Sequence, residues 1–203
     1  MPPATDTPRT LLSLAGAQPQ RARLSQATLV IVDAQNEYRS GSLPLAGIDR
    51  AVERLALLLQ RARAAATPII HIAQIGRPGG LFDPEGPGGA FLTEATPQGA
   101  EPIVHKRLPN AFAGTDLDAI VRELGRPQLI IAGFMTHMCV SATARSALDH
   151  GHNSFVAADA AATRALPDAL DGSPVAASEV HRVALAEIAD RYAEVIETDN
   201  IAS

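Results

Sequence analysis

Short apolar segments alternate with amphipathic segments along most of this chain, and that alternation limits the folds open to it. Residues 28–33 (TLVIVD) are almost all apolar and end at a carboxylate, which is typical of a parallel strand covered on both faces. Residues 48–66 repeat apolar side chains at three- and four-residue spacing, as in a helix that packs on a sheet. The same reasoning predicts strands at 28–33, 69–73, 102–104, 128–133, 153–158 and 193–197, and helices at 48–66, 115–124, 139–150 and 174–192.

This order of elements predicts an α/β fold, a doubly wound sheet of six parallel strands between two layers of helices. With 203 residues, of which 46% are hydrophobic, the chain can bury a core of its own. We expect a single domain over residues 11–203, preceded by a mobile segment at residues 1–10. Ligands of such sheets bind beyond the carboxyl ends of the strands, so functional side chains are expected at that edge.

Charge and composition restrict the partners that the protein can have. Seventeen basic and 22 acidic residues give a net charge of −5, with no basic block, so nucleic acid is not expected to bind. No run of 18 apolar residues is present, and the N-terminus lacks the basic and apolar parts of a signal peptide, so we expect no membrane partner. The single cysteine, Cys139, excludes an internal disulfide. Together these features predict a cytoplasmic protein.

Residues 76–102 differ from the rest of the chain. They contain seven glycines and five prolines, so they form neither a regular helix nor a regular strand. Phe82 and Phe91 provide apolar anchors, which favours an ordered loop. Long loops in compact domains are often lids or binding loops, and we expect this one to be a lid or a subunit contact.

Cys139 is the first candidate for chemistry. It follows the predicted strand 128–133 and a tight turn, at the start of the predicted helix 139–150. Free N–H groups and the helix dipole at such a position favour a thiolate and lower the pKa of a cysteine. The same N–H groups could receive an oxyanion. The alternative is a buried packing residue, because cysteine is among the residues most often buried.

Asp33 and Lys106 are expected at the same edge of the sheet. Asp33 ends the first strand and could take a proton from the thiol, although an aspartate there could equally cap a turn. Lys106 follows the short strand 102–104 and could hold a thiolate and an oxyanion, although most lysines are solvated surface charges. His137 lies two residues before Cys139, so a Cys–His pair is a second possibility.

Metal and nucleotide sites have no support in the sequence. The chain lacks the H-x-x-x-H spacing of a helical zinc site, so we expect no metal. No G-x-x-x-x-G-K-[ST] or G-x-G-x-x-G motif follows a predicted strand, so we expect no nucleotide cofactor either.

Four segments resemble the isochorismatase-like cysteine hydrolases. They are VIVDAQNEY (30–38), HKRLPNAFAGTDLDAIV (105–121), GFMTHMCVSATARSALDHG (133–151) and VAADAAAT (156–163). The resemblance extends from about residue 11 to residue 197 and rests on the order and spacing of the four segments together. It implies a six-stranded parallel sheet between helices, in agreement with the fold expected from the pattern of elements.

By that resemblance, Asp33, Lys106 and Cys139 match the catalytic triad of the family. Cys139 would attack an amide or carbamoyl carbon, Asp33 would take its proton, and Lys106 would hold both groups in place. The backbone N–H groups of Thr136 and Cys139 would bind the oxyanion. The family usually carries a cis peptide just before the matching threonine, here the bond between Met135 and Thr136.

The resemblance also bears on substrate and assembly. Nicotinamidases of the family carry an Asp-Trp-His metal motif after the second strand, where this chain reads AQIGR (73–77), so a metal-free amidase without other cofactors is implied. The family tends to form dimers, tetramers or larger rings, so we expect a homo-oligomer, with residues 76–102 and 167–174 as candidate contacts. The side chains expected near a small-molecule substrate are Tyr38, Gln74, Phe82, Phe112 and His137.

The leading hypothesis is therefore a hydrolase that cleaves a non-peptide C–N bond, in an amide, ureido or carbamoyl group, through a thioester on Cys139. Two alternatives remain. Isochorismatase-type hydrolysis of a vinyl ether is one, although family members with that activity typically lack the cysteine. A non-catalytic redox-sensitive thiol or binding protein on the same fold is the other, because an activated thiolate also oxidises readily.

Overall fold

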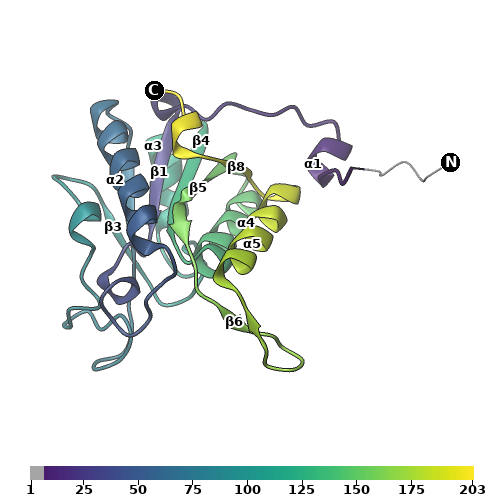
Figure 1. Ribbon diagram of the computed structural model, residues 1–203. Coiled ribbons are helices and arrows are strands. Elements are labelled where there is room, and N and C mark those ends of the chain that lie inside the picture. Colours follow the sequence, from purple (N-terminus) through teal and green to yellow (C-terminus); the bar gives the residue numbers. More distant parts are fainter. Residues whose placement is uncertain (1–6) are drawn as a thin grey trace.

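The computed structural model describes residues 7–203 and shows a parallel sheet with helices on both faces (Figure 1). Six strands lie in the order β3-β2-β1-β4-β5-β8, and all their pairings are parallel. This confirms the predicted doubly wound fold. The strands are β1 (Ala27–Val32), β2 (Ile69–Gln74), β3 (Ile103–Lys106), β4 (Gln128–Phe134), β5 (Ser154–Ala162) and β8 (Glu194–Ile196).

The helices form the two outer layers. Helix α2 (Ile48–Ala64) packs on one face of the sheet, and α3 (Leu117–Leu124), α4 (Ser141–Asp149) and α5 (Ala177–Arg191) lie on the other. A short helix, α1 (Leu11–Leu14), precedes β1 and is capped by the Thr10 hydroxyl. Residues 1–6 of the predicted mobile segment lie outside the described residues. No helix within residues 7–203 is both long and apolar enough to cross a bilayer.

The central strands β1 and β4 bring two functional segments together at their carboxyl ends. Every residue of both strands is buried, and Val32 pairs with Gly133 in the register. Gly133 has φ of 115°, and a Cβ there would lie 2.0 Å from the Val32 carbonyl oxygen. Only glycine permits this approach, so β4 can end beside Asp33 and deliver the turn with Cys139 next to it.

Two expectations about the C-terminal half need correction. The helix predicted at 139–150 begins earlier, because a π-helical turn (Thr136–Val140) precedes α4. Pro174, predicted as the first residue of a helix, lies instead in an antiparallel hairpin, and α5 starts at Ala177. The hairpin closes because the Asp168 N–H donates to the Ser173 carbonyl at 2.7 Å, and its strands are β6 (Leu166–Pro167) and β7 (Pro174–Val175).

The glycine- and proline-rich segment 76–102 forms an ordered loop that is hydrogen-bonded to the end of β1. The Asn36 N–H donates to the Ala90 carbonyl at 2.8 Å, and the Leu92 N–H donates to the Ala34 carbonyl at 2.9 Å. The Gln35 side chain donates to the Gly89 carbonyl at 2.8 Å. These bonds hold the middle of the loop against the strand that carries Asp33.

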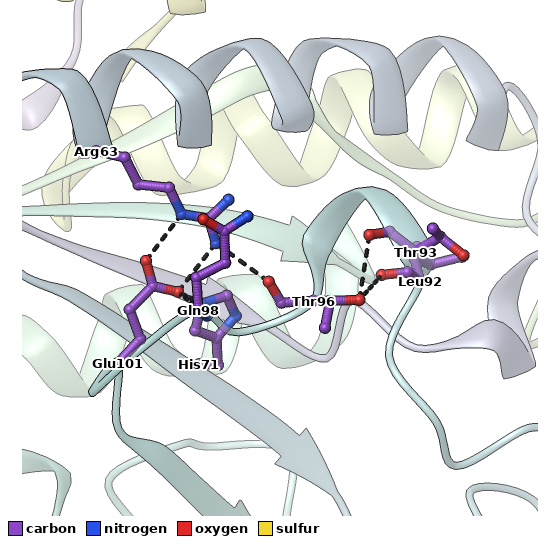
Figure 2. A network of polar contacts seen from close by, with 7 residues as sticks. All are labelled: Arg63, His71, Leu92, Thr93, Thr96, Gln98 and Glu101. Carbon is purple, nitrogen blue, oxygen red and sulfur yellow. Dashed lines mark hydrogen bonds and ion pairs between the residues drawn. The ribbon is translucent and has the colours of Figure 1, made fainter.

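The last part of this loop is held by a second set of polar contacts, beneath helix α2 (Figure 2). Glu101 pairs with Arg63 at 2.8 Å and with Nε2 of the buried His71 at 2.8 Å. It also accepts the Gln98 N–H at 2.8 Å, while Arg63 reaches the Thr96 carbonyl at 3.1 Å. Burial acts to raise the pKa of Glu101, but its hydrogen bonds to Arg63, Gln98 and His71 together lower it to about 2.

We expect Glu101→Gln to destabilise the fold in a pH-dependent way. The pKa of Glu101 is lower in the folded protein than its ordinary value of 4.5. Its contribution to the free energy of unfolding is therefore full above pH 4.5 and is lost as the pH falls towards 2. At pH 7 the loss should be on the order of 2–3 kcal/mol, because one pKa unit corresponds to about 1.4 kcal/mol and solvent screening of these partly exposed partners reduces the full value. Urea unfolding between pH 7 and pH 3 measures it. Glu53→Gln, at an exposed site on α2, is the control, and an equal effect of both changes would contradict the expectation.

Candidate active site

Asp33 stands at the junction of β1 and the loop that follows. Its φ of 49° lies in the left-handed region, which aspartate tolerates better than most residues. Its N–H donates to the Ile72 carbonyl at 3.0 Å, which fixes the turn against β2. The side chain is fully buried, and burial raises the pKa of the carboxyl, against the opposing effect of Lys106.

Lys106, the last residue of β3, points its ammonium group into the protein interior. Nζ lies 2.7 Å from Asp33 Oδ2, 2.7 Å from Gln74 Oε1 and 3.3 Å from Cys139 Sγ. An ammonium has three N–H donors, so these three neighbours account for all of them. The structure thus brings the three residues of the predicted triad together, with Gln74 as a fourth member of the cluster.

Cys139 lies within the π-helical turn, as its fourth residue, rather than at the free start of a helix. The thiol is 5% exposed. Burial and the neighbouring Asp33 carboxylate raise the pKa of Cys139 to about 12, and Lys106 offsets only part of this effect. The expectation of a lowered pKa was therefore wrong, because the helix-start argument took no account of burial or of a carboxylate beside the sulfur.

The turn before Cys139 contains the candidate oxyanion donors. The cis peptide bond joins Phe134 and Met135, so the expectation at the next bond, between Met135 and Thr136, is corrected by one residue. Within residues 7–203, the N–H groups of Met135 and Thr136 donate to no protein acceptor, whereas the Met135 carbonyl accepts from Met138 and Val140. The turn therefore presents free N–H groups close to the thiol.

The remaining predicted pocket residues fall into two groups. Tyr38 and Phe82 are buried together, with ring centroids 5.0 Å apart, and burial, with the charge of Asp33, raises the pKa of Tyr38. Phe112 instead stacks on the His150 ring, at 4.9 Å between centroids. His137 turns its Nδ1 to the Thr163 hydroxyl, so no hydrogen bond joins it to Cys139.

Several residues of the site had no recognised signal in the sequence. Gln35 accepts the Gln74 N–H at 2.9 Å and donates to the Gln74 carbonyl at 3.1 Å, which fixes the residue that binds Lys106. His181 of α5 lies 2.9 Å from the Thr136 hydroxyl. Gln35 could have been noticed because it follows Asp33 by two residues, whereas His181 is far away in the chain and nothing in its helix distinguishes it.

The described part of the chain holds no evident metal centre. No group of three or more His, Cys, Asp or Glu side chains arranged to hold a metal ion is found among residues 7–203. His150 and His152, at H-x-H spacing, both approach the Asp118 carboxylate, at 3.5 and 2.8 Å. Asp118 also pairs with Arg122 at 2.8 Å, so this cluster already has a protein cation as partner.

Comparison with known proteins places these features in context. Residues 27–200 match the model of the isochorismatase domain. A solved isochorismatase structure from Pseudomonas putida KT2440 is 43% identical, with a TM-score of 0.92, and the match covers 96% of this chain and 100% of that one. A secreted isochorismatase effector of Verticillium dahliae is 35% identical over 190 residues, which are 93% of this chain and 97% of the relative.

Two relatives carry the names of other hydrolases. A streptothricin hydrolase of Streptomyces noursei is 36% identical over 153 residues, 74% of this chain and 55% of the relative. A maleamate amidohydrolase of Pseudomonas putida is 26% identical over 185 residues, which cover 83% of this chain and 81% of the relative.

The two charged neighbours of Cys139 should change its reactivity in opposite directions. Asp33→Asn removes a negative charge and should lower the pKa of the thiol. Each tenfold gain in acidity makes the thiolate about tenfold more abundant at pH 8, so alkylation by iodoacetamide should become faster by about that factor. Lys106→Ala removes the positive charge and should slow it. Mass spectrometry of Cys139 over pH 7–11 measures both, with Asp116→Asn, an exposed carboxylate, as control. Equal rates in all variants would contradict this electrostatic coupling.

Proposed function

The chain belongs to the isochorismatase family, and from this premise we propose that it is a cysteine hydrolase of small molecules. The bond cleaved is a non-peptide C–N bond in an amide, ureido or carbamoyl group. One observation carries the proposal: the Lys106 ammonium lies within 2.7 Å of the Asp33 carboxylate and 3.3 Å of the Cys139 sulfur, in a buried site. The name of the maleamate amidohydrolase relative supports the bond type.

Asp33 is the general base in this proposal. The resting thiol is neutral, because the pKa of Cys139 is about 12, so a proton must leave as the sulfur attacks. Burial raises the pKa of Asp33, which makes its carboxylate a stronger base than an exposed aspartate. Lys106 stabilises the negative charge, first on the carboxylate and then on the sulfur, without giving up its own proton.

The remaining steps follow from the positions of these groups. Attack of Sγ on the substrate carbonyl carbon forms a tetrahedral intermediate, and the backbone N–H groups of Thr136 and Cys139 receive its oxyanion; the Thr136 N–H has no protein acceptor within residues 7–203. Protonated Asp33 then gives its proton to the leaving nitrogen, and ammonia or an amine departs as the C–N bond breaks. Asp33 next takes a proton from water, whose oxygen attacks the thioester. The C–S bond then breaks and releases the acid, and Asp33 returns the proton to the sulfur.

Gln74, Tyr38 and Phe82 shape the site around this chemistry. The side-chain oxygen of Gln74 accepts a hydrogen bond from the Lys106 ammonium at 2.7 Å, and so orients the ammonium towards the two reacting groups. Phe82 packs its ring against Tyr38 and brings the glycine- and proline-rich loop over the cluster. This loop therefore forms one wall of the substrate site in the proposed enzyme.

We expect Cys139→Ala to lower kcat at least a thousandfold on any amide or ureido substrate found by screening, because the nucleophile is lost. Asp33→Asn should lower it to a similar extent, although the same change makes the thiol easier to alkylate. Steady-state kinetics measures the loss, and mass spectrometry of the wild type after rapid acid quenching should show an acyl group on Cys139.

His105→Gln, at an exposed site on β3 next to Lys106, is the matched control and should keep kcat within about threefold. Full turnover by Cys139→Ala would contradict the mechanism. If alkylated protein kept its activity on a vinyl ether, an isochorismatase-type reaction would replace the proposal. A thiol that oxidises reversibly in a protein without turnover would favour the redox-sensing alternative.

A further inference from the structure

A cavity of about 440 Å³ opens at the same edge of the sheet as the triad, along the carboxyl-terminal half of β5. It lies between the first turns of α2 and α5, and its size is in the range of sites for small molecules. Neither Asp33, Lys106 nor Cys139 lines it, so it is separate from the triad. Alanines make up half of the lining residues: Ala46, Ala51, Ala158, Ala161, Ala162 and Ala177.

The unpaired charge of this cavity is positive. Arg50 lines it, is exposed, and forms no ion pair within residues 7–203. The carboxylate in the lining, Asp159, is already paired with Arg54 at 2.6 Å and accepts the Thr198 N–H at 2.8 Å. A cation in the first turn of α2 opposes the helix dipole, so Arg50 is not placed there to stabilise its own helix.

His181 adds a neutral hydrogen-bond donor to the opposite wall. Burial lowers the pKa of His181, so the ring is uncharged at neutral pH. Its Nδ1 lies 2.9 Å from the Thr136 hydroxyl. In the tautomer in which the Thr136 hydroxyl donates to Nδ1, the ring proton resides on Nε2, and the proposal below uses this tautomer. Ser178, in the first turn of α5, supplies a hydroxyl on the same side.

We propose that this cavity binds a small carboxylate, with Arg50 as its cation and His181 Nε2 and the Ser178 hydroxyl as donors. The free N–H groups in the first turns of α2 and α5 add to the positive potential without being required as ligands. The apolar alanine lining accepts a short carbon chain attached to the carboxylate. This site is independent of the proposed thiol chemistry, because no residue of the triad contributes to it.

The cavity also touches the turn that precedes Cys139. His181 holds the Thr136 hydroxyl, and Thr163, another lining residue, binds His137 through its hydroxyl. A carboxylate on His181 would therefore contact a side chain that is bonded directly to the turn with the free N–H groups. Ligand binding should therefore change the NMR signals of the His181 ring.

Succinate is a suitable probe, and succinamide, which has the same carbon chain without charge, is its matched control. We expect succinate to shift the His181 ring signals in NMR spectra of the wild-type protein, while those of His105, exposed on the distant edge strand β3, stay in place. Arg50→Gln should weaken succinate binding about tenfold or more, because a hydrogen bond to a charged group is lost. Arg182→Gln, the neighbouring exposed arginine of α5 outside the lining, should bind as the wild type does.

Three results would overturn the proposal: equal binding of succinate and succinamide, unchanged succinate affinity in Arg50→Gln, or shifts at His105 with none at His181. The folded state of each variant is checked by its backbone NMR spectrum. The titration needs no turnover, so its outcome is separable from that of the kinetic test on Cys139. A protein without any hydrolase activity could still bind succinate here, and an active hydrolase could fail to do so.

Discussion

The buried ammonium of Lys106 is the constraint on which the rest of the site depends. Transfer of such an ion from water to a protein interior costs several kcal/mol, and only well-placed partners offset it. Its partners come from three different strand ends: Asp33 after β1, Gln74 at the end of β2 and Cys139 after β4. They meet because β3, β2, β1 and β4 are consecutive in the sheet, so its parallel order places four carboxyl ends side by side. The Lys106 ammonium can therefore be buried only because the sheet has this strand order.

The glycine- and proline-rich loop is part of the same construction. Gln35 bonds to Gln74 in both directions and to the Gly89 carbonyl, so one side chain joins the loop to the partner of Lys106. Glu37, also buried, accepts the Ser42 N–H at 2.6 Å and lies against Gly88, where a Cβ would come within 2.2 Å of its carboxylate. The loop therefore packs closely on the residues that follow Asp33, and its hydrogen bonds to them fix a segment that forms neither a regular helix nor a regular strand.

The sequence was sufficient for the strands and for predicting that Asp33, Lys106 and Cys139 meet at one edge of the sheet, and insufficient for the surroundings of the thiol. Buried parallel strands leave short apolar runs that end at a polar residue, and Asp33 and Lys106 could be placed by this pattern. The hairpin around Pro174 and the π-helical turn leave no comparable pattern, because each depends on which distant segment packs beside it. The contact between His181 and Thr136 is of the same kind, since 45 residues separate the two in the chain. The sequence also gave no sign of the partners of two expected pocket residues, since the Phe112 ring stacks on His150 and the His137 ring bonds to Thr163.

The pKa of Cys139 shows how burial decides between two electrostatic effects. A helix start favours a thiolate by a modest amount, typically about 0.3–1 kcal/mol at an exposed site. Desolvation and a neighbouring carboxylate act in the opposite direction and are larger here, so the pKa rises to about 12 and the resting sulfur keeps its proton. Burial raises the pKa of Asp33 as well, so the pKa values of the Cys139 thiol and the Asp33 carboxyl differ less than they would if Asp33 were exposed. In the proposed mechanism, the same desolvation that keeps the thiol protonated therefore makes Asp33 a more effective base. In the proposed mechanism, Lys106 lies beside both groups and stabilises whichever of them carries the negative charge, so the proton moves within the site without leaving an unpaired charge in an apolar interior.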